Sequence, residues 1–195
     1  PPDSPDALVM TTPPEVLDLL APDTARTASL TPGVAYRYLW SPRGPWAVHL
    51  VQARVADRCD LGFSVLRPAS RRAGGRGRAT VTDMVGASSE DVLAAVNADF
   101  FTADGAAVGT EVVDGEVQTA TDRPTFAWRP GQAPWMGSST PADGGVRLGW
   151  TVPAEGDGMT EAVGGFPDLI DAGGRVGDLE VAQRPSFAAA RHPRS

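Results

Sequence analysis

Residues 34–40 read VAYRYLW, residues 41–45 read SPRGP, and residues 46–55 read WAVHLVQARV. The first run is rich in aromatic and β-branched side chains, which favour strands. The last run alternates, because Trp46, Val48 and Leu50 have the same parity and would share one face of a strand. The proline and glycine residues between the two runs are typical of a turn. We therefore predict a β-hairpin over residues 34–55.

Further strands are expected along the rest of the chain. Asp114 and Gly115 separate the runs EVV and EVQ, which is a strong hairpin signal. Shorter strands are expected at residues 63–66, 126–129 and 146–152. Helices are expected at residues 15–20, where Val16, Leu19 and Leu20 would pack, and from residue 82 or 83 into the apolar run 92–96. The predicted class is α+β, a mixed, strand-rich sheet with few helices, completed by sequence beyond residue 195.

Composition limits the possible functions. The chain has 195 residues, 42% of them hydrophobic, and its 17 basic and 24 acidic residues give a net charge of −7. An acidic chain of this kind is a poor partner for nucleic acid. The single cysteine, Cys59, excludes an internal disulfide and a Cys-based zinc site. No apolar run reaches 18 residues, so no transmembrane segment is predicted. All basic residues are Arg, which suggests a bacterial source with a GC-rich genome.

The chain is divided into an exposed lead-in, residues 1–29, and a domain, residues 30–195. The lead-in is rich in Pro, Asp and Thr and begins at Pro1 rather than at Met, which is compatible with a leader removed earlier. Within the domain, residues 67–78 carry five arginines and several glycines, and we expect a mobile, solvated loop there.

The first candidate site is the run NADFFTADG at residues 97–105. In an extended backbone Asn97, Asp99 and Phe101 project to one face, while Phe100 projects into the core. An amide beside a carboxylate could bind sugar hydroxyls, carry out acid/base chemistry or bind a metal. The alternative is an Asx-turn that closes a strand.

The second candidate is the glycine pair Gly164 and Gly165, in the run AVGGFPDLIDAG at residues 162–173. Adjacent glycines allow backbone N–H groups to approach an anion such as phosphate. A plain β-turn that leads into a strand at residues 169–170 is the alternative.

The third candidate is the run ARHPRS at residues 190–195. Arg191 and Arg194 could neutralise a phosphodiester, since guanidinium groups bind phosphate oxygens in pairs, and His192 could transfer a proton. A solvated basic tail is the alternative.

The order of four motifs resembles that of the phosphodiester glycosidase family. These are GVAY at residues 33–36, AVNADFF at 95–101, GFP at 165–167 and the Arg-Ser step at Arg194 and Ser195. The family includes the lysosomal uncovering enzyme, which removes N-acetylglucosamine from a phosphate-linked mannose. The resemblance covers roughly residues 30–195. It implies an α+β fold and catalytic roles for Asn97, Asp99 and Arg194. It implies substrate-binding roles for a second set, namely Gly164, Gly165, Arg191, His192 and Ser195.

The resemblance implies a hydrolase that cleaves the glycosidic bond of a sugar-1-phosphodiester in a cell-envelope glycopolymer or glycolipid. A non-catalytic carbohydrate-binding or envelope-interaction module of the same fold, and a phosphodiesterase that cuts P–O, are the alternatives. No cofactor is predicted, and a divalent metal stays open. The expected partner is a phosphorylated glycan, at a secreted or envelope-associated location. In the family the Arg-Ser step continues into a further strand, so we also expect a second fragment of the same polypeptide, separated by cleavage after Ser195.

Overall fold

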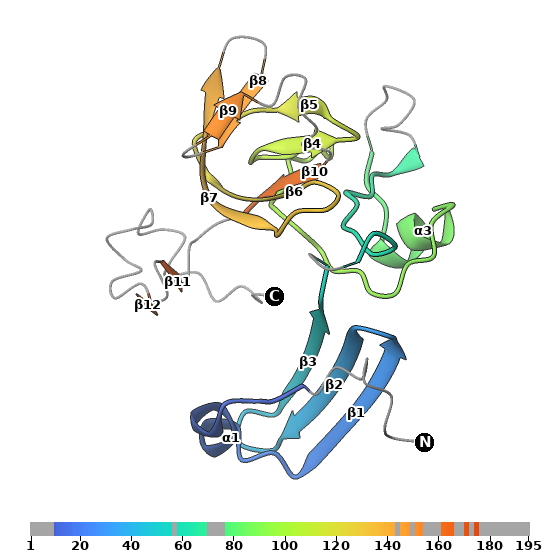
Figure 1. The fold of residues 1–195 in the computed structure, drawn as a ribbon, viewed down its shortest axis with the longest axis vertical. Helices are drawn as coiled ribbons and strands as arrows, with labels where there is room; N and C mark the ends of the chain where they lie inside the picture. The colour runs from blue at the N-terminus through green and yellow to red at the C-terminus, as the bar shows by residue number, and fades with distance from the viewer. Residues whose placement is uncertain are drawn as a thin grey trace. The chain divides into compact units, whose positions relative to one another are not determined.

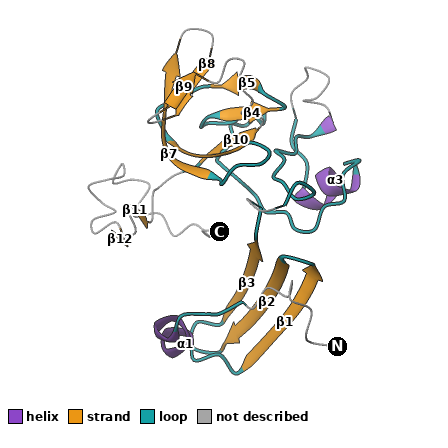
Figure 2. Ribbon diagram, in the orientation of Figure 1, coloured by secondary structure: helices purple, strands orange, loops and turns teal. Residues whose placement is uncertain are grey.

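The chain forms two compact units, divided between Asp60 and Leu61, and each is described by itself. The computed structural model describes residues 10–55, 58–69, 77–142, 145–148, 151–153, 161–165, 170–171 and 174–175. Strands dominate both units, and two short helices are assigned within the described residues (Figures 1 and 2). The expected strand-rich α+β class with few helices is therefore confirmed.

The first unit is a three-stranded antiparallel sheet in the order β1-β2-β3. The helix α1 (Pro14–Leu20) precedes the strands β1 (Thr24–Thr31), β2 (Val34–Ser41) and β3 (Trp46–Ala53). Strands β2 and β3 pair from Val34 with Ala53 to Ser41 with Trp46 without a bulge. This regular ladder confirms the predicted hairpin.

The two faces of this sheet differ in burial. Ala35, Leu39 and Ser41 of β2 share one parity and are all buried. On the same face the Arg37 guanidinium donates to the carbonyl of Met10, and the Ser41 hydroxyl donates to the carbonyl of Leu20. The segment before β1 therefore lies against this buried face.

That segment is more ordered than an exposed lead-in. Met10 and Leu20 are buried, and β1 begins at Thr24, inside the stretch that the sequence analysis assigned to the lead-in. Of the three apolar residues expected to pack from α1, only Leu20 does, while Val16 is 38% and Leu19 is 65% exposed. Leu19 lies about 100° round the helix from Leu20. Because α1 has only two turns and packs through Leu20, the face that carries Leu19 is exposed to solvent.

The second unit contains a seven-stranded sheet in the order β5-β4-β10-β6-β7-β8-β9, in which every neighbouring pair is antiparallel. The strands are β4 (Glu111–Val113), β5 (Glu116–Thr119), β6 (Pro124–Trp128), β7 (Trp135–Ala142), β8 (Gly145–Leu148), β9 (Thr151–Pro153) and β10 (Glu161–Gly164). The helix α3 (Val81–Gly86) precedes them, and β11 (Ile170–Asp171) and β12 (Gly174–Arg175) form a separate two-stranded pair.

Local turn chemistry explains the β4–β5 hairpin. Asp114 and Gly115 both have positive φ, 51° and 81°, as the tight turns of two-residue hairpins require. The hairpin predicted from the Asp-Gly pair is confirmed. The long strand β7 uses its first half to pair with β6 and its second half to pair with β8, and it curves accordingly in Figure 1.

Strand β10 lies inside the sheet, between β4 and β6. It fits there because Gly164 approaches the neighbouring backbone closely. A Cβ at Gly164 would lie 2.8 Å from both the Cα of Gly109 and the N of Thr110. The glycine that was expected to bind an anion therefore serves strand packing.

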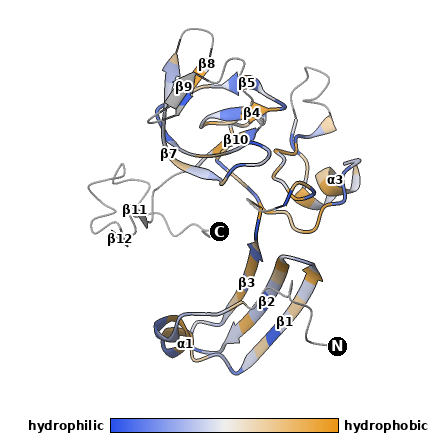
Figure 3. Ribbon diagram, in the orientation of Figure 1, coloured by the Kyte–Doolittle hydropathy of each residue, from blue (hydrophilic) through white to orange (hydrophobic). Residues whose placement is uncertain are grey.

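The core of this sheet is small and partly polar. Its buried apolar cluster consists of Val112, Ala127, Val146 and Ala162. Beside it lie three buried hydroxyl groups, in which the Ser139 oxygen is 2.8 Å from both Thr110 Oγ1 and Thr125 Oγ1. The pale and blue segments of several strands in Figure 3 show the same mixed character. Hydrogen bonds between the hydroxyls offset the cost of removing them from water.

Three local predictions for the second unit are wrong. Residues 63–66 form no ladder, and residues 92–100 form neither helix nor strand, because α3 ends at Gly86. Residues 146–152 contribute to two strands, β8 and β9, rather than to one. Residues 63–66 lie against the sheet without pairing in it, whereas β8 and β9 extend the sheet as two short strands.

Candidate functional site

Residues 61–67, which we call the crossing segment, pass over one face of the seven-stranded sheet. Phe63 packs edge-on against Phe126 and Trp128 of β6, with ring centroids 4.9 and 5.8 Å apart. The N–H of Val65 donates to the side chain of Glu161 on β10, and Arg67 forms an ion pair with Glu111 on β4. The contacts therefore follow the strand order β6, β10, β4. Phe63 and Arg67 make their contacts through side chains, and Val65 makes its contact through the backbone.

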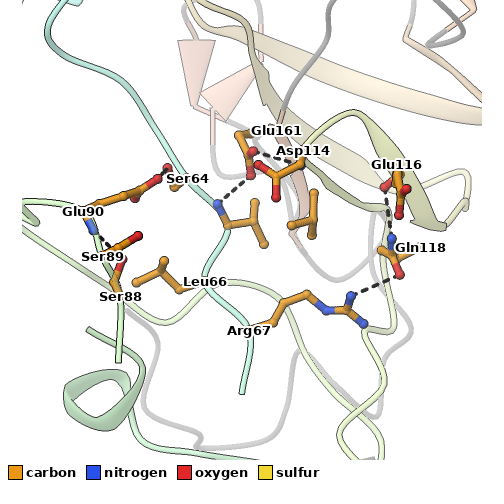
Figure 4. Close-up of a pocket in the computed structure, with 12 residues that line it drawn as sticks. Ser64, Leu66, Arg67, Ser88, Ser89, Glu90, Asp114, Glu116, Gln118 and Glu161 are labelled. Atoms are coloured by element: carbon orange, nitrogen blue, oxygen red, sulfur yellow. Dashed lines mark hydrogen bonds between the residues drawn. The ribbon is translucent and has the colours of Figure 1, made fainter. Parts of the chain in front are cut away.

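A pocket of about 590 Å³ opens where the crossing segment meets the β4–β5 hairpin (Figure 4). Its volume is within the usual range for small-molecule sites. It is lined by the crossing segment, a serine-rich loop, the hairpin and the first residue of β10: Ser64, Val65, Leu66, Arg67, Ser88, Ser89, Glu90, Val113, Asp114, Glu116, Gln118 and Glu161.

Glu161 is the buried carboxyl group of the pocket, only 6% exposed. Its Oε2 accepts a hydrogen bond from the N–H of Val65 at 2.7 Å, and its Oε1 accepts one from the N–H of Asp114 at 3.1 Å. Figure 4 shows this carboxyl group between the two backbone segments. Glu161 thus ties the crossing segment to the β4–β5 turn.

The surroundings raise the pKa of Glu161 above its usual 4.5. Burial is the main cause, because it removes water from the charged form, and repulsion from Asp114 and Glu90 acts in the same direction. The two backbone hydrogen bonds act in the opposite direction but do not cancel the shift. A carboxyl group that holds its proton to higher pH can serve as a general acid.

Among the described residues, Arg67 is the only basic one that lines the pocket. Its Nε lies 3.5 Å from Glu111 Oε1, and its Nη1 donates to Gln118 Oε1 at 3.1 Å. The side chain is 14% exposed, so it is not part of a solvated loop as expected from residues 67–78. Residues 70–76 of that loop lie outside the described residues.

The remaining polar groups of the pocket are mainly acceptors. Ser64 Oγ donates to Glu90 Oε1 at 2.9 Å, and the N–H of Glu90 donates to Ser88 Oγ at 3.1 Å. With Asp114 and Glu116 nearby, the lining that the structure describes is acidic apart from Arg67. Such a set of carboxylates, hydroxyls and one amide suits a ligand rich in hydroxyl donors.

Asn97 and Asp99 do not lie side by side on a strand. Asp99 has a φ of 56°, which interrupts the alternation, and Phe100 is 41% exposed instead of packing in the core. Asp99 Oδ1 accepts from the N–H of Phe100 at 2.6 Å, and Oδ2 accepts from the N–H of Gly109 at 2.5 Å. Asp99 therefore closes the loop 99–109. It is not the Asx-turn of the alternative, because its side chain binds the N–H groups of residues 100 and 109 and no strand precedes it within residues 77–98. Asn97 is exposed.

The glycine pair does not present free N–H groups. The N–H of Gly164 donates to the carbonyl of Thr110 at 2.6 Å, and the N–H of Gly165 donates to the carbonyl of Pro124 at 2.8 Å. Both groups are used by the sheet. These two glycines therefore do not form the predicted anion site.

The C-terminal candidates Arg191, His192, Arg194 and Ser195 lie outside the described residues. None of the other candidates, Asn97, Asp99, Gly164 and Gly165, lines the pocket at Glu161.

Within the described part of the chain, no group of three or more His, Cys, Asp or Glu side chains is arranged to hold a metal ion. Across the same residues, no helix has the length and apolar character needed to cross a bilayer. Comparison of the chain with protein-family models, curated proteins and solved structures finds no match.

Glu161 was missed by sequence analysis because nothing local distinguishes it. It is one of 24 acidic residues, and it follows a stretch rich in Gly, Asp and Glu. Its burial comes from the crossing segment, almost a hundred residues earlier in the chain, and only the fold brings the two together. The one available signal was its position at the head of the apolar run 162–163, where strands begin.

Proposed function

We propose that the chain is a hydrolase that cleaves the glycosidic bond of a sugar-1-phosphodiester, with Glu161 as its general acid. The observation that carries the proposal is a buried carboxyl group with a raised pKa in a ligand-sized pocket. The pocket supports a sugar-like ligand and an acid. The phosphodiester part of the substrate, and its source in a cell-envelope glycopolymer or glycolipid, rest on the sequence resemblance.

In this mechanism the bond between the anomeric carbon and the phosphate oxygen breaks. Glu161 gives its proton to the departing oxygen, and a water molecule adds to the anomeric carbon. Asp114 or Glu90, both close enough to raise the pKa of Glu161, takes the proton of that water. Arg67 supplies the positive charge of the pocket on the side of the phosphate.

The test is release of free sugar from a sugar-1-phosphodiester, followed in oxygen-18 water. Label in the sugar supports the proposal, whereas label in the phosphate indicates a P–O cleaving phosphodiesterase and contradicts it. Glu161→Gln should lower kcat by about a hundredfold or more, as loss of a general acid does. Glu15→Gln, on the exposed side of α1, is the matched control and should keep full activity.

A non-catalytic carbohydrate-binding module is the second candidate. It is favoured by the two hydrogen bonds that Glu161 accepts, since these alone would explain a buried carboxyl group as a structural link. In that case the ligand is bound and recovered unchanged. Retention of intact sugar-1-phosphodiester by the folded wild-type protein would decide for this candidate.

A further inference from the structure

The exposed face of the three-stranded sheet carries an aromatic row. Tyr36, Tyr38 and Trp40 of β2 share one parity, opposite to the buried residues Ala35 and Leu39. On a strand, residues two apart are spaced by about 6.7 Å. Their Cβ atoms therefore form a regular line along the central strand.

Cross-strand neighbours extend this row into a surface. The ring of His49 on β3 lies 6.0 Å from that of Tyr36 and 5.1 Å from that of Tyr38, and its Nδ1 is hydrogen-bonded to the Tyr36 hydroxyl at 2.8 Å. On the other side, Arg26 of β1 pairs with Tyr38. We call Tyr36, Tyr38, Trp40, His49 and Arg26 the aromatic face.

The aromatic face is open to solvent. The three rings of β2 are partly exposed, and their flanking residues on the same face are exposed: Arg26, Ala28, Ala47, His49 and Val51. A row of flat rings edged by hydroxyl, imidazole and guanidinium groups is unusual for a surface with no ligand, because exposed aromatic area is costly.

We propose that the aromatic face binds a linear, uncharged glycan, with successive sugar rings stacked on Tyr36, Tyr38 and Trp40. Sugar rings offer apolar C–H faces to the aromatic rings and hydroxyl groups at their edges to Arg26 and to the Tyr36–His49 pair. Single-stranded nucleic acid also stacks on aromatic rows, but a chain with a net charge of −7 repels a polyanion. All residues of the aromatic face belong to the first unit, whereas all residues that line the pocket at Glu161 belong to the second.

The chain offers a selective probe, because Tyr36 and Tyr38 are its only two tyrosines. In protein labelled at tyrosine, titration with a neutral β-linked hexasaccharide should shift the ring NMR signals of both. The hexasaccharide should bind at least about tenfold more tightly than its monosaccharide, since it covers several rings. Tyrosine signals that stay unmoved up to millimolar hexasaccharide would overturn the proposal, as would tighter binding of a single-stranded oligonucleotide.

Variants test the individual rings. Trp40→Ala and Tyr38→Ala should each weaken hexasaccharide binding by about tenfold, the upper range for one aromatic contact. Trp40→Phe, which keeps a ring, should restore most of the affinity and is also the safeguard against a fold defect in Trp40→Ala. Trp46→Ala is the matched control, because Trp46 belongs to the same sheet, is 45% exposed and lies on the opposite face.

Equal losses in Trp40→Ala and Trp46→Ala would contradict the proposal. Glu161→Gln should leave hexasaccharide binding unchanged while it removes hydrolysis. The same set of variants therefore distinguishes a failure of the glycan-binding proposal from a failure of the proposal of hydrolysis at Glu161.

Discussion

At the level of single residues, Glu161 makes the stability of the second unit depend on pH. Its folded-state pKa lies above its usual 4.5, so the folded state binds its proton more tightly than the unfolded state does. The free energy of unfolding should therefore fall as pH rises from 4.5 through the raised pKa. Denaturant titrations at a series of pH values from 4.5 upwards should show this slope in the wild type and a weaker one in Glu161→Gln.

Glu116→Gln is the control for this slope. Glu116 lines the same pocket but is exposed, so Glu116→Gln removes a carboxyl group from the pocket without changing the buried one. If Glu161→Gln keeps the wild-type slope of unfolding free energy against pH while Glu116→Gln changes it, the pH dependence does not come from Glu161.

Asp99 is expected to matter for stability. Its two oxygens accept the N–H groups of Phe100 and Gly109, and its φ is 56°. Asp99→Ala loses both hydrogen bonds and leaves an alanine in the left-handed region, at a cost of about 3 kcal/mol. Asp99→Asn keeps one acceptor and tolerates this backbone, so it should cost about 1 kcal/mol. Unfolding by urea measures both, and equal losses would show that the backbone conformation is not the cause.

At the level of elements, the position of β10 depends on Gly164. An added methyl group there would meet backbone atoms of Gly109 and Thr110, which cannot move aside singly. Gly164→Ala should destabilise the second unit by about 3 kcal/mol. The adjacent Gly165 has no atom within 4 Å of an added Cβ, so Gly165→Ala should change stability by less than about 0.5 kcal/mol. Thermal unfolding of the two variants side by side is the measurement; similar midpoints would refute the packing role.

The hydroxyl network beside the core gives a further prediction. Ser139→Ala would leave Thr110 and Thr125 without their common partner, at a cost of about 2 kcal/mol. The next residue of the same strand, Thr140, is exposed, and Thr140→Ala should be nearly neutral. Chemical denaturation of both variants tests this, and a neutral Ser139→Ala would mean that the network can re-form without its centre.

Elements whose signals are local were predictable from the sequence. The hairpin of β2 and β3 follows from alternation and a turn, and that of β4 and β5 follows from Asp114 and Gly115. The crossing segment was expected as a strand at residues 63–66, because an extended apolar run has the same pattern whether it pairs in a ladder or lies across one. Periodicity alone does not separate these cases.

At the level of the whole molecule, the candidate site was not predictable. Glu161 is buried because β10 lies between β4 and β6 and because residues 61–67 cover it. Both arrangements bring together parts of the chain that are far apart in sequence. Asn97 and Asp99 were singled out by their residue types, by strand alternation and by the family resemblance. The single positive φ at Asp99 was enough to overturn a prediction built on alternation.

The position of β10 inside the sheet also affects how the second unit responds to a pulling force. A strand at the edge of a sheet can peel away one hydrogen bond at a time, but β10 is bonded on both sides, to β4 and to β6. A pulling force on it must shear two ladders together, while the carboxylate of Glu161 fastens its first residue to a third segment. Under load, Glu161 therefore adds a third attachment to a strand that is already paired on both sides.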